Sequence, residues 1–239
     1  MVVAAARRSL RARGDAPPDD PRVATLALFD LDRTLLAGSS LVALGRALAA
    51  EGYVSRRHLT VAALRDARFR RRGASDGEVG RLRSDALAAV RGLERAPLVD
   101  LARSVGFALA QSIAPGARFL LERHLAAGDF CVVLSASPQE LVDAVCAAVG
   151  AHRAIGTRGE VVDGCFTGRL DGTFCYGPGK LVRLRQALGP VDLRRSWAYA
   201  DSASDLPLLE AVGNPVVVNP DRGLRAAARS RGWPILTVG

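Results

Sequence analysis

Short apolar runs alternate with helix-length segments along most of the chain. Residues 23–30 (VATLALFD) form an apolar run that ends at an acidic residue, which predicts a strand buried on both faces. Four more strands are predicted at residues 130–134, 196–200, 215–218 and 234–238. Helices are predicted between them, at residues 117–127, 139–149, 180–188 and 222–231, with a shorter one that ends at Val212. Strands separated by helices favour a parallel sheet with right-handed crossovers.

Two segments depart from this alternation. After a helix at 39–50, residues 56–113 show helical periodicity and almost no strand pattern, so they predict a helical insert behind the first strand. Residues 156–174 are instead rich in Gly and Thr. Their alternation and their Asp-Gly pairs predict a β-hairpin or two short antiparallel strands.

The pattern therefore divides the chain into three parts. Residues 1–22 carry arginines but no continuous apolar segment, so we expect a disordered tail there rather than a secretory signal. Residues 23–40 and 114–239 are expected to form an α/β fold, a Rossmann-like parallel sheet core flanked by helices. Residues 41–113 are expected to form a separate helical domain. No window approaches the ~18 apolar residues of a membrane span.

Three of the predicted strands lead into clusters of polar residues. These clusters are DLDRT at 30–34, SASP at 135–138 and DSASD at 201–205. In parallel α/β sheets, ligands bind outside the carboxyl ends of the strands. We therefore expect the three clusters to meet in one site.

The acidic residues of these clusters indicate a metal-assisted reaction. Asp30 and Asp32 follow one strand, and Asp201 and Asp205 follow another, with no His or Cys beside them. Such carboxylates suit a hard cation such as Mg²⁺. One member of the first pair can hold the ion or attack as a nucleophile, while the other exchanges a proton with a leaving group. Capping of the next helix is the structural alternative for the second pair.

The remaining polar residues supply hydroxyls and a positive charge. Ser135 and Ser137 lie before a predicted helix, where they can bind an anion or simply cap the helix. Lys180, the only lysine in the chain, supplies a compact charge, although it can also be a surface residue. Carboxylates, Mg²⁺, a hydroxyl and one lysine are the parts that phosphoryl transfer requires.

In this order, FDLDRT, LSAS, Lys180 and ADSASD resemble the motifs of the haloacid dehalogenase (HAD) superfamily of phosphatases. The resemblance runs from about Val23 to the end, and the nearest subgroup is the phosphoserine-phosphatase-like branch, subfamily IB. It implies that residues 41–113 form a C1-type cap over the site.

The resemblance also implies a role for each matched residue. Asp30 would attack phosphorus to form an aspartyl-phosphate, and Asp32 would protonate the leaving oxygen and then activate water. The phosphate-binding group would be Thr34, Ser135, Ala136 through its amide, Ser137 and Lys180. Mg²⁺ would be held by Asp30, Asp32 through its carbonyl, Asp201 and Asp205, the last of which orients the water shell or Lys180.

Three positions depart from the superfamily pattern. Arg33 and Ala200 stand where the superfamily often has Gly. Ser39 stands where phosphoserine phosphatases carry a Glu that meets the substrate's amino group, so the resemblance does not name phosphoserine as the substrate. We expect a small phosphorylated metabolite, with phosphoserine, another phosphorylated amino acid or amino alcohol, and a lysophospholipid head group all open. The alternatives are a phosphotransferase with the same intermediate, or a non-catalytic module that binds phosphate or lysophospholipid.

Charge and cysteine content indicate which binding partners and which cellular location to expect. The net charge is +9, and arginines are dense at 56–72 in the insert, where a solvated helix face is the simple explanation. Attraction of an anionic substrate or weak contact with an acidic membrane surface is the alternative. Without interleaved aromatics the stretch is a poor nucleic-acid platform. Four cysteines without a CxxC pair favour a reducing cytoplasm, and oligomeric state is not indicated.

Overall fold

The computed structural model describes residues 25–54 and 76–238. The tail predicted at 1–22 and the arginine-dense part of the insert lie outside these residues. Strands β1 to β8 are Leu26–Asp30, Phe130–Pro138, Arg153–Thr157, Gly159–Val162, Cys165–Leu170, Trp197–Ala200, Asn214–Val218 and Ile235–Leu236. The helices are α2 Ser40–Ala50, α4 Asp76–Val90, α5 Arg95–Gln111, α6 Pro115–Ala126, α7 Gln139–Val149, α8 Pro178–Leu188, α9 Leu206–Ala211 and α10 Arg222–Arg231, with a 3₁₀ turn, η2, at Ala203–Asp205.

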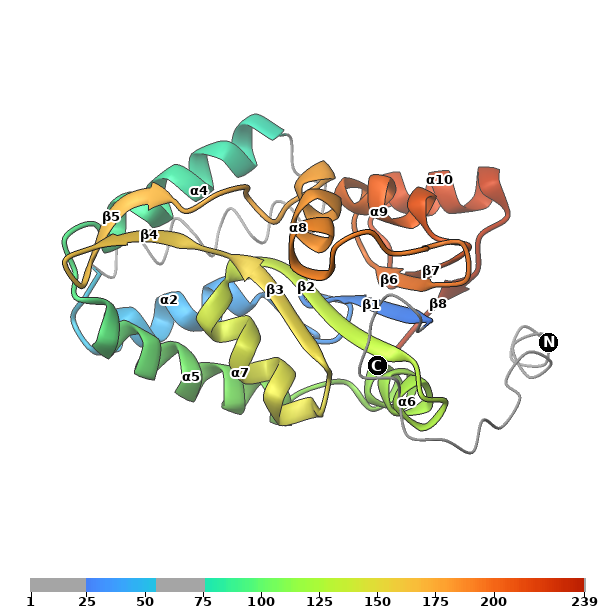
Figure 1. Ribbon diagram of the computed structural model, residues 1–239, viewed down its shortest axis with the longest axis horizontal. Helices are drawn as coiled ribbons and strands as arrows, with labels where there is room; N and C mark the ends of the chain where they lie inside the picture. Colours follow the sequence, from blue (N-terminus) through green and yellow to red (C-terminus); the bar gives the residue numbers. More distant parts are fainter. Residues whose placement is uncertain (1–24, 55–75, 239) are drawn as a thin grey trace.

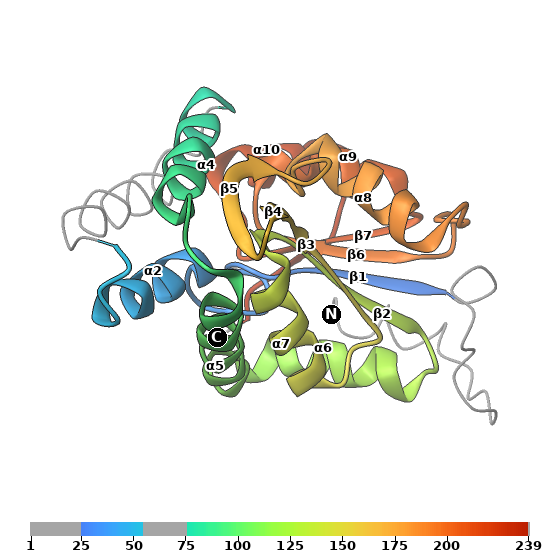
Figure 2. The same ribbon diagram turned by 60° about the vertical axis from the view of Figure 1, so that its left-hand side comes forward.

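Six strands form one parallel sheet in the order β3-β2-β1-β6-β7-β8. Figure 2 shows α8, α9 and α10 over one face and α6 and α7 over the other. Strand β1 packs against both layers because alternate side chains point to opposite faces. Ala27 and Phe29 belong to the apolar cluster that includes α6 and α7, and Leu26 and Leu28 belong to the cluster on the other side. The predicted α/β class with a Rossmann-like parallel core is confirmed.

The sheet has one more strand than the pattern predicts. β3, Arg153–Thr157, pairs in parallel with β2 at the edge of the sheet. Its burial runs from exposed at Arg153 to buried at Ile155, so it lacks the continuous apolar run that marks the central strands. The hairpin predicted just after it is confirmed as β4 and β5, which pair antiparallel.

In the described part of the helical insert predicted at 56–113, the helices are α4 and α5, and the helix predicted before the insert is α2. α5 packs closely on α7, since a Cβ atom at Gly106 would lie 2.6 Å from the Cβ of Ala144. α4 lies against the β4–β5 hairpin on the side of the molecule away from α10 (Figure 1). The division into a core and a separate cap at 41–113 stays a prediction.

Backbone hydrogen bonds join the hairpin to the turn between α4 and α5. The amide of Gly92 donates to the carbonyl of Phe166 at 2.7 Å, and the amide of Phe166 donates to the carbonyl of Leu93 at 3.0 Å. The amide of Arg95 donates to the carbonyl of Gly164 at 2.8 Å. Segments about 70 residues apart in sequence therefore form one small antiparallel patch. Within the described part of the chain, no helix is long and apolar enough to cross a bilayer.

Candidate active site

Strand register brings the predicted polar clusters to one edge of the sheet. Asp30 pairs with Leu134 across β1 and β2, so Ser135 follows directly beside it. Phe29 pairs with Tyr199 across β1 and β6, which places Asp201 just past the neighbouring strand end. Parallel strands that end in register present their next residues to a common space.

Asp30 is buried and held from two sides. Its Oδ1 lies 2.6 Å from Nζ of Lys180, and its Oδ2 accepts a hydrogen bond of 3.2 Å from the Thr34 hydroxyl. The loop between them turns at Arg33, whose φ of 61° lies in the left-handed region that favours glycine. The preference for Gly at this position therefore has a backbone cause. Here the Arg33 Nε lies 3.7 Å from Oδ2 of Asp201.

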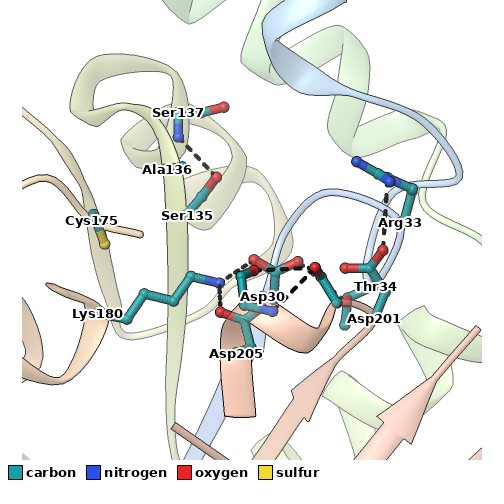
Figure 3. Close-up of polar contacts among 12 residues, drawn as sticks. Asp30, Arg33, Thr34, Ser135, Ala136, Ser137, Cys175, Lys180, Asp201 and Asp205 are labelled. Atoms are coloured by element: carbon teal, nitrogen blue, oxygen red, sulfur yellow. Dashed lines mark hydrogen bonds and ion pairs between the residues drawn. The ribbon is translucent and has the colours of Figure 1, made fainter. Parts of the chain in front are cut away.

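The carboxylates of Asp201 and Asp205 lie close to that of Asp30. One oxygen from each of Asp30, Asp201 and Asp205 lies within 4.8 Å of the others, and all three residues are buried. Figure 3 shows Lys180 reaching from α8 to both Asp30 and Asp205, with Nζ 2.8 Å from Oδ1 of Asp205. Lys180 and Arg33 bring two positive groups against three buried carboxylates, so an excess of negative charge remains. This oxygen-rich donor set fits a hard divalent cation.

The pKa values of the clustered groups reflect this excess of negative charge. Burial raises the pKa of Asp205 to about 6, although Lys180 opposes the shift. Burial, reinforced by the charge of Asp30, also holds the pKa of Asp201 well above its usual range. Burial disfavours the charged form of Lys180, but Asp205 and Asp30 outweigh it and raise the pKa of the ammonium group. Lys180 is therefore a fixed positive charge at neutral pH.

Asp32 has a different environment from the three clustered carboxylates. Burial first, and the neighbouring charge of Asp30 second, raise the pKa of Asp32 to about 6, while a hydrogen bond from the Ser40 amide opposes the shift. A carboxyl group with a pKa near neutrality can both donate and accept a proton. Asp32 also lines the cavity beside Asp30.

Ser135, Ala136 and Ser137 lie in the end of β2 beside this cluster. The amide of Ser137 donates to the Ser135 hydroxyl at 3.1 Å, and the carbonyl of Ala136 accepts from the Thr157 hydroxyl at 2.7 Å. These contacts hold the backbone at this end of β2. Neither serine is the residue that caps α7, because no side chain bonds to that helix start.

Sequence reasoning missed two residues that organise the site. Ser40 donates its amide to Asp32, and its hydroxyl is hydrogen-bonded to that of Ser137. Asp221 accepts from the Ala203 amide at 3.0 Å and caps α10, so it holds the turn that carries Asp205. Ser39 and Ser40 are adjacent in the sequence, but no local pattern distinguishes them: Ser39 caps α2, and Ser40 contacts Asp32 and Ser137.

Buried carboxylates and one lysine lie at the carboxyl edge of this parallel α/β sheet, just beyond the first strand. This is where enzymes with a Rossmann-like core place their active sites. The family model of haloacid dehalogenase-like hydrolases matches residues 27–210. The chain belongs to this family.

Known proteins similar to this chain carry different substrate names. It is 40% identical over 223 residues to phosphoserine phosphatase SerB1 of Mycobacterium tuberculosis, covering 92% of this chain and 72% of the relative. It is 33% identical over 223 residues to histidinol-phosphatase of Neisseria meningitidis, covering 88% and 97%. A Bordetella pertussis protein of unknown function has a similar structure, with a TM-score of 0.76, 31% identity and coverage of 89% and 98%. The family is therefore clear, while the names disagree about the substrate.

Proposed function

We propose that this chain is a Mg²⁺-dependent phosphatase that hydrolyses a phosphate monoester through an aspartyl-phosphate on Asp30. The observation that carries the proposal is the buried Asp30 carboxylate, held by Lys180 at 2.6 Å and grouped with Asp201 and Asp205. The family membership and the phosphatase names of its relatives support the same reaction class.

In the first half-reaction, a carboxylate oxygen of Asp30 forms a bond to phosphorus while the bond from phosphorus to the leaving oxygen breaks. Asp32 gives its proton to that oxygen, for which a pKa of about 6 suits it. Lys180 stays charged and offsets the negative charge of the phosphoryl group. Thr34 keeps the Asp30 carboxylate in position.

In the second half-reaction, Asp32 takes a proton from water, whose oxygen attacks phosphorus. The bond from phosphorus to Asp30 breaks, and inorganic phosphate leaves. Ser135, the amide of Ala136 and Ser137 are proposed to bind the phosphate oxygens at the start of α7. Mg²⁺ is proposed to be held by Asp30, Asp201, Asp205 and the carbonyl of Asp32, where it would neutralise phosphate charge.

Residues 41–113 are proposed to act as a cap together with the β4–β5 hairpin. Their described helices and the hairpin line the same cavity as Asp30 and Lys180. A cover of this kind excludes water from the reacting phosphate, which strengthens the electrostatic interactions inside. The substrate is proposed to be a small phosphorylated compound rather than a nucleic acid.

The direct test is phosphate release from a generic aryl phosphate. We expect the purified protein to release phosphate with Mg²⁺ and to stop when EDTA removes the ion. The chelated sample should regain activity when Mg²⁺ is added in excess. An absence of turnover across a broad panel of phosphate esters with Mg²⁺ would contradict the proposal.

Mg²⁺ should stabilise the fold in a pH-dependent way. Carboxyl groups whose pKa is raised by folding, Asp205 to about 6 and Asp201 also upward, bind protons in the folded protein while their unfolded counterparts are ionised. For Asp205 this contribution to stability is therefore present at low pH and is lost as pH rises through about 4 to 6, and the contribution of Asp201 changes in the same direction. Mg²⁺ competes with those protons, so we expect it to raise the melting temperature by several degrees at pH 8 and much less at pH 5.

Scanning fluorimetry with and without Mg²⁺ at the two pH values measures this difference. Asp201→Asn is the control, since it removes one proposed ligand and should shrink the shift at pH 8. Equal shifts at both pH values would show that the ion stabilises the protein somewhere other than the carboxylate cluster.

A further inference from the structure

A cavity of about 440 Å³ reaches from the acidic cluster to the insert and the hairpin. Asp30, Asp32 and Lys180 line it on the side of the sheet. The apolar lining includes Leu44, Leu48, Leu82, Val90, Phe166 and Phe174. The volume falls within the range of small-molecule sites, which are lined mainly by apolar side chains with a few placed polar groups. Here the placed polar groups gather at the proposed reaction centre.

Away from the acidic cluster, the described charged residues that line this cavity include Arg83 and Asp85 on α4 and Glu140 on α7, and each of these three has a partner. The Arg83 guanidinium lies 5.4 Å from the ring centroid of Phe174, a cation–π contact. Glu140 accepts a hydrogen bond of 3.0 Å from Arg95. Asp85 is not free either. On this wall the carboxylates of Asp85 and Glu140 already have partners, so a substrate with an ammonium group would have to compete with existing contacts for a counter-charge.

The hydroxyl of Ser39 is also engaged. It accepts a hydrogen bond of 3.4 Å from the Val42 amide and caps α2. A serine has no charge to offer a substrate's amino group, and one acceptor position of this hydroxyl already serves the helix. Next along the same wall come Leu41 and Leu44, which continue the apolar surface from α2.

Building on the phosphatase function proposed above, we propose that the preferred substrate is a phosphate monoester of an apolar alcohol. Its phosphate meets Asp30, and its hydrocarbon part fills the cavity below α4 and the hairpin. The ester oxygen leaves with the proton of Asp32, so the products are the apolar alcohol and, after water attacks the enzyme-bound phosphoryl group, inorganic phosphate. Burial of each methylene group supplies binding energy remote from phosphorus, which the reaction can use in its transition state.

The test is a series of straight-chain alkyl phosphates from ethyl to octyl, each below the concentration at which it forms micelles. We expect kcat/KM to rise about two- to fourfold for each added methylene until the cavity is full. O-phosphoserine and histidinol phosphate, which carry charged groups, should be hydrolysed less efficiently than the alkyl ester of similar length.

A cavity-filling variant separates the role of the cavity from general effects. Ala86 lies on α4 and lines the cavity, so Ala86→Phe should flatten the dependence on chain length. Ala88→Phe places the same ring on an exposed position of the same helix and should keep the wild-type dependence. The ratio of kcat/KM for octyl and ethyl phosphate within each enzyme is independent of how much of the sample is folded. If Ala86→Phe does not fold, the wild-type series decides alone.

Three results would overturn the inference, and they have different meanings. Hydrolysis of ethyl or aryl phosphate with no gain along the series, or with phosphoserine as the best substrate, contradicts the apolar substrate and leaves the phosphatase standing. No turnover of any ester contradicts both proposals. If the wild-type series is steep but folded Ala86→Phe keeps the same octyl-to-ethyl ratio, the alkyl group of the substrate binds outside this cavity. That result likewise overturns the inference.

Discussion

Asp30→Asn should reduce phosphate release by on the order of 10⁴-fold or more, because an amide cannot form the aspartyl-phosphate. The substitution is nearly isosteric, and Lys180 keeps its contact with Asp205 at 2.8 Å, so the variant should fold. Initial rates on an aryl phosphate with Mg²⁺ measure the loss. Acid-quenched wild-type enzyme should retain phosphate covalently during turnover, and the variant should retain none.

Asp163→Asn is the matched control, since it makes the same change at an exposed turn of the hairpin. Asn tolerates the positive φ of 50° found there, so this variant should keep wild-type activity. A rate within tenfold of wild type for Asp30→Asn would mean that another residue attacks phosphorus.

Lys180→Met should affect both stability and activity. The lysine is buried and lies within hydrogen-bonding distance of Asp30 and Asp205, so its loss leaves two buried carboxylates without their cation. Breaking a buried ion pair in this way costs about 3–5 kcal/mol, which urea unfolding in EDTA should detect as a lower free energy of unfolding. Activity should fall by about 10²–10³-fold, the scale reported for removal of one transition-state donor.

Two further measurements define what Lys180 does. Mg²⁺ should restore part of the lost stability of Lys180→Met, because the ion neutralises the same carboxylates. Arg185→Met removes an exposed cation from the same helix and should change the free energy of unfolding by less than about 0.5 kcal/mol. A Lys180→Met protein as stable as wild type in EDTA would contradict the electrostatic account of the cluster.

Much of the core could be predicted because its signals are local. The apolar runs in β1, β2 and β6 each lead into a polar cluster, and parallel strands place such clusters at one edge. The positions of Asp30 and Asp201 at that edge therefore follow from pattern alone. The roles given to them stay predictions until the variants are measured.

The features that escaped prediction depend on contacts between distant segments. β3 is a half-exposed edge strand, so it lacks the apolar run that the sequence pattern detects. The bonds from Ser40 to Asp32 and to Ser137 join residues up to 97 positions apart, and no local period encodes them. The length of β2 was also underestimated: it continues through polar residues to Pro138, which pairs with Thr157 of β3 after a shift in register beyond Leu134.

The backbone hydrogen bonds between residues 92–95 and the β4–β5 hairpin limit how the proposed cap can move away from the cavity. A lid formed by one insertion would swing on two hinges, where its chain leaves and re-enters the core. The β4–β5 hairpin is a second segment, between β3 and α8, so an outward movement of the proposed cap must either break three backbone hydrogen bonds or move the hairpin with it. Such a movement would bend the chain at four connections to the core rather than two, which favours a small displacement of the proposed cap over a wide one.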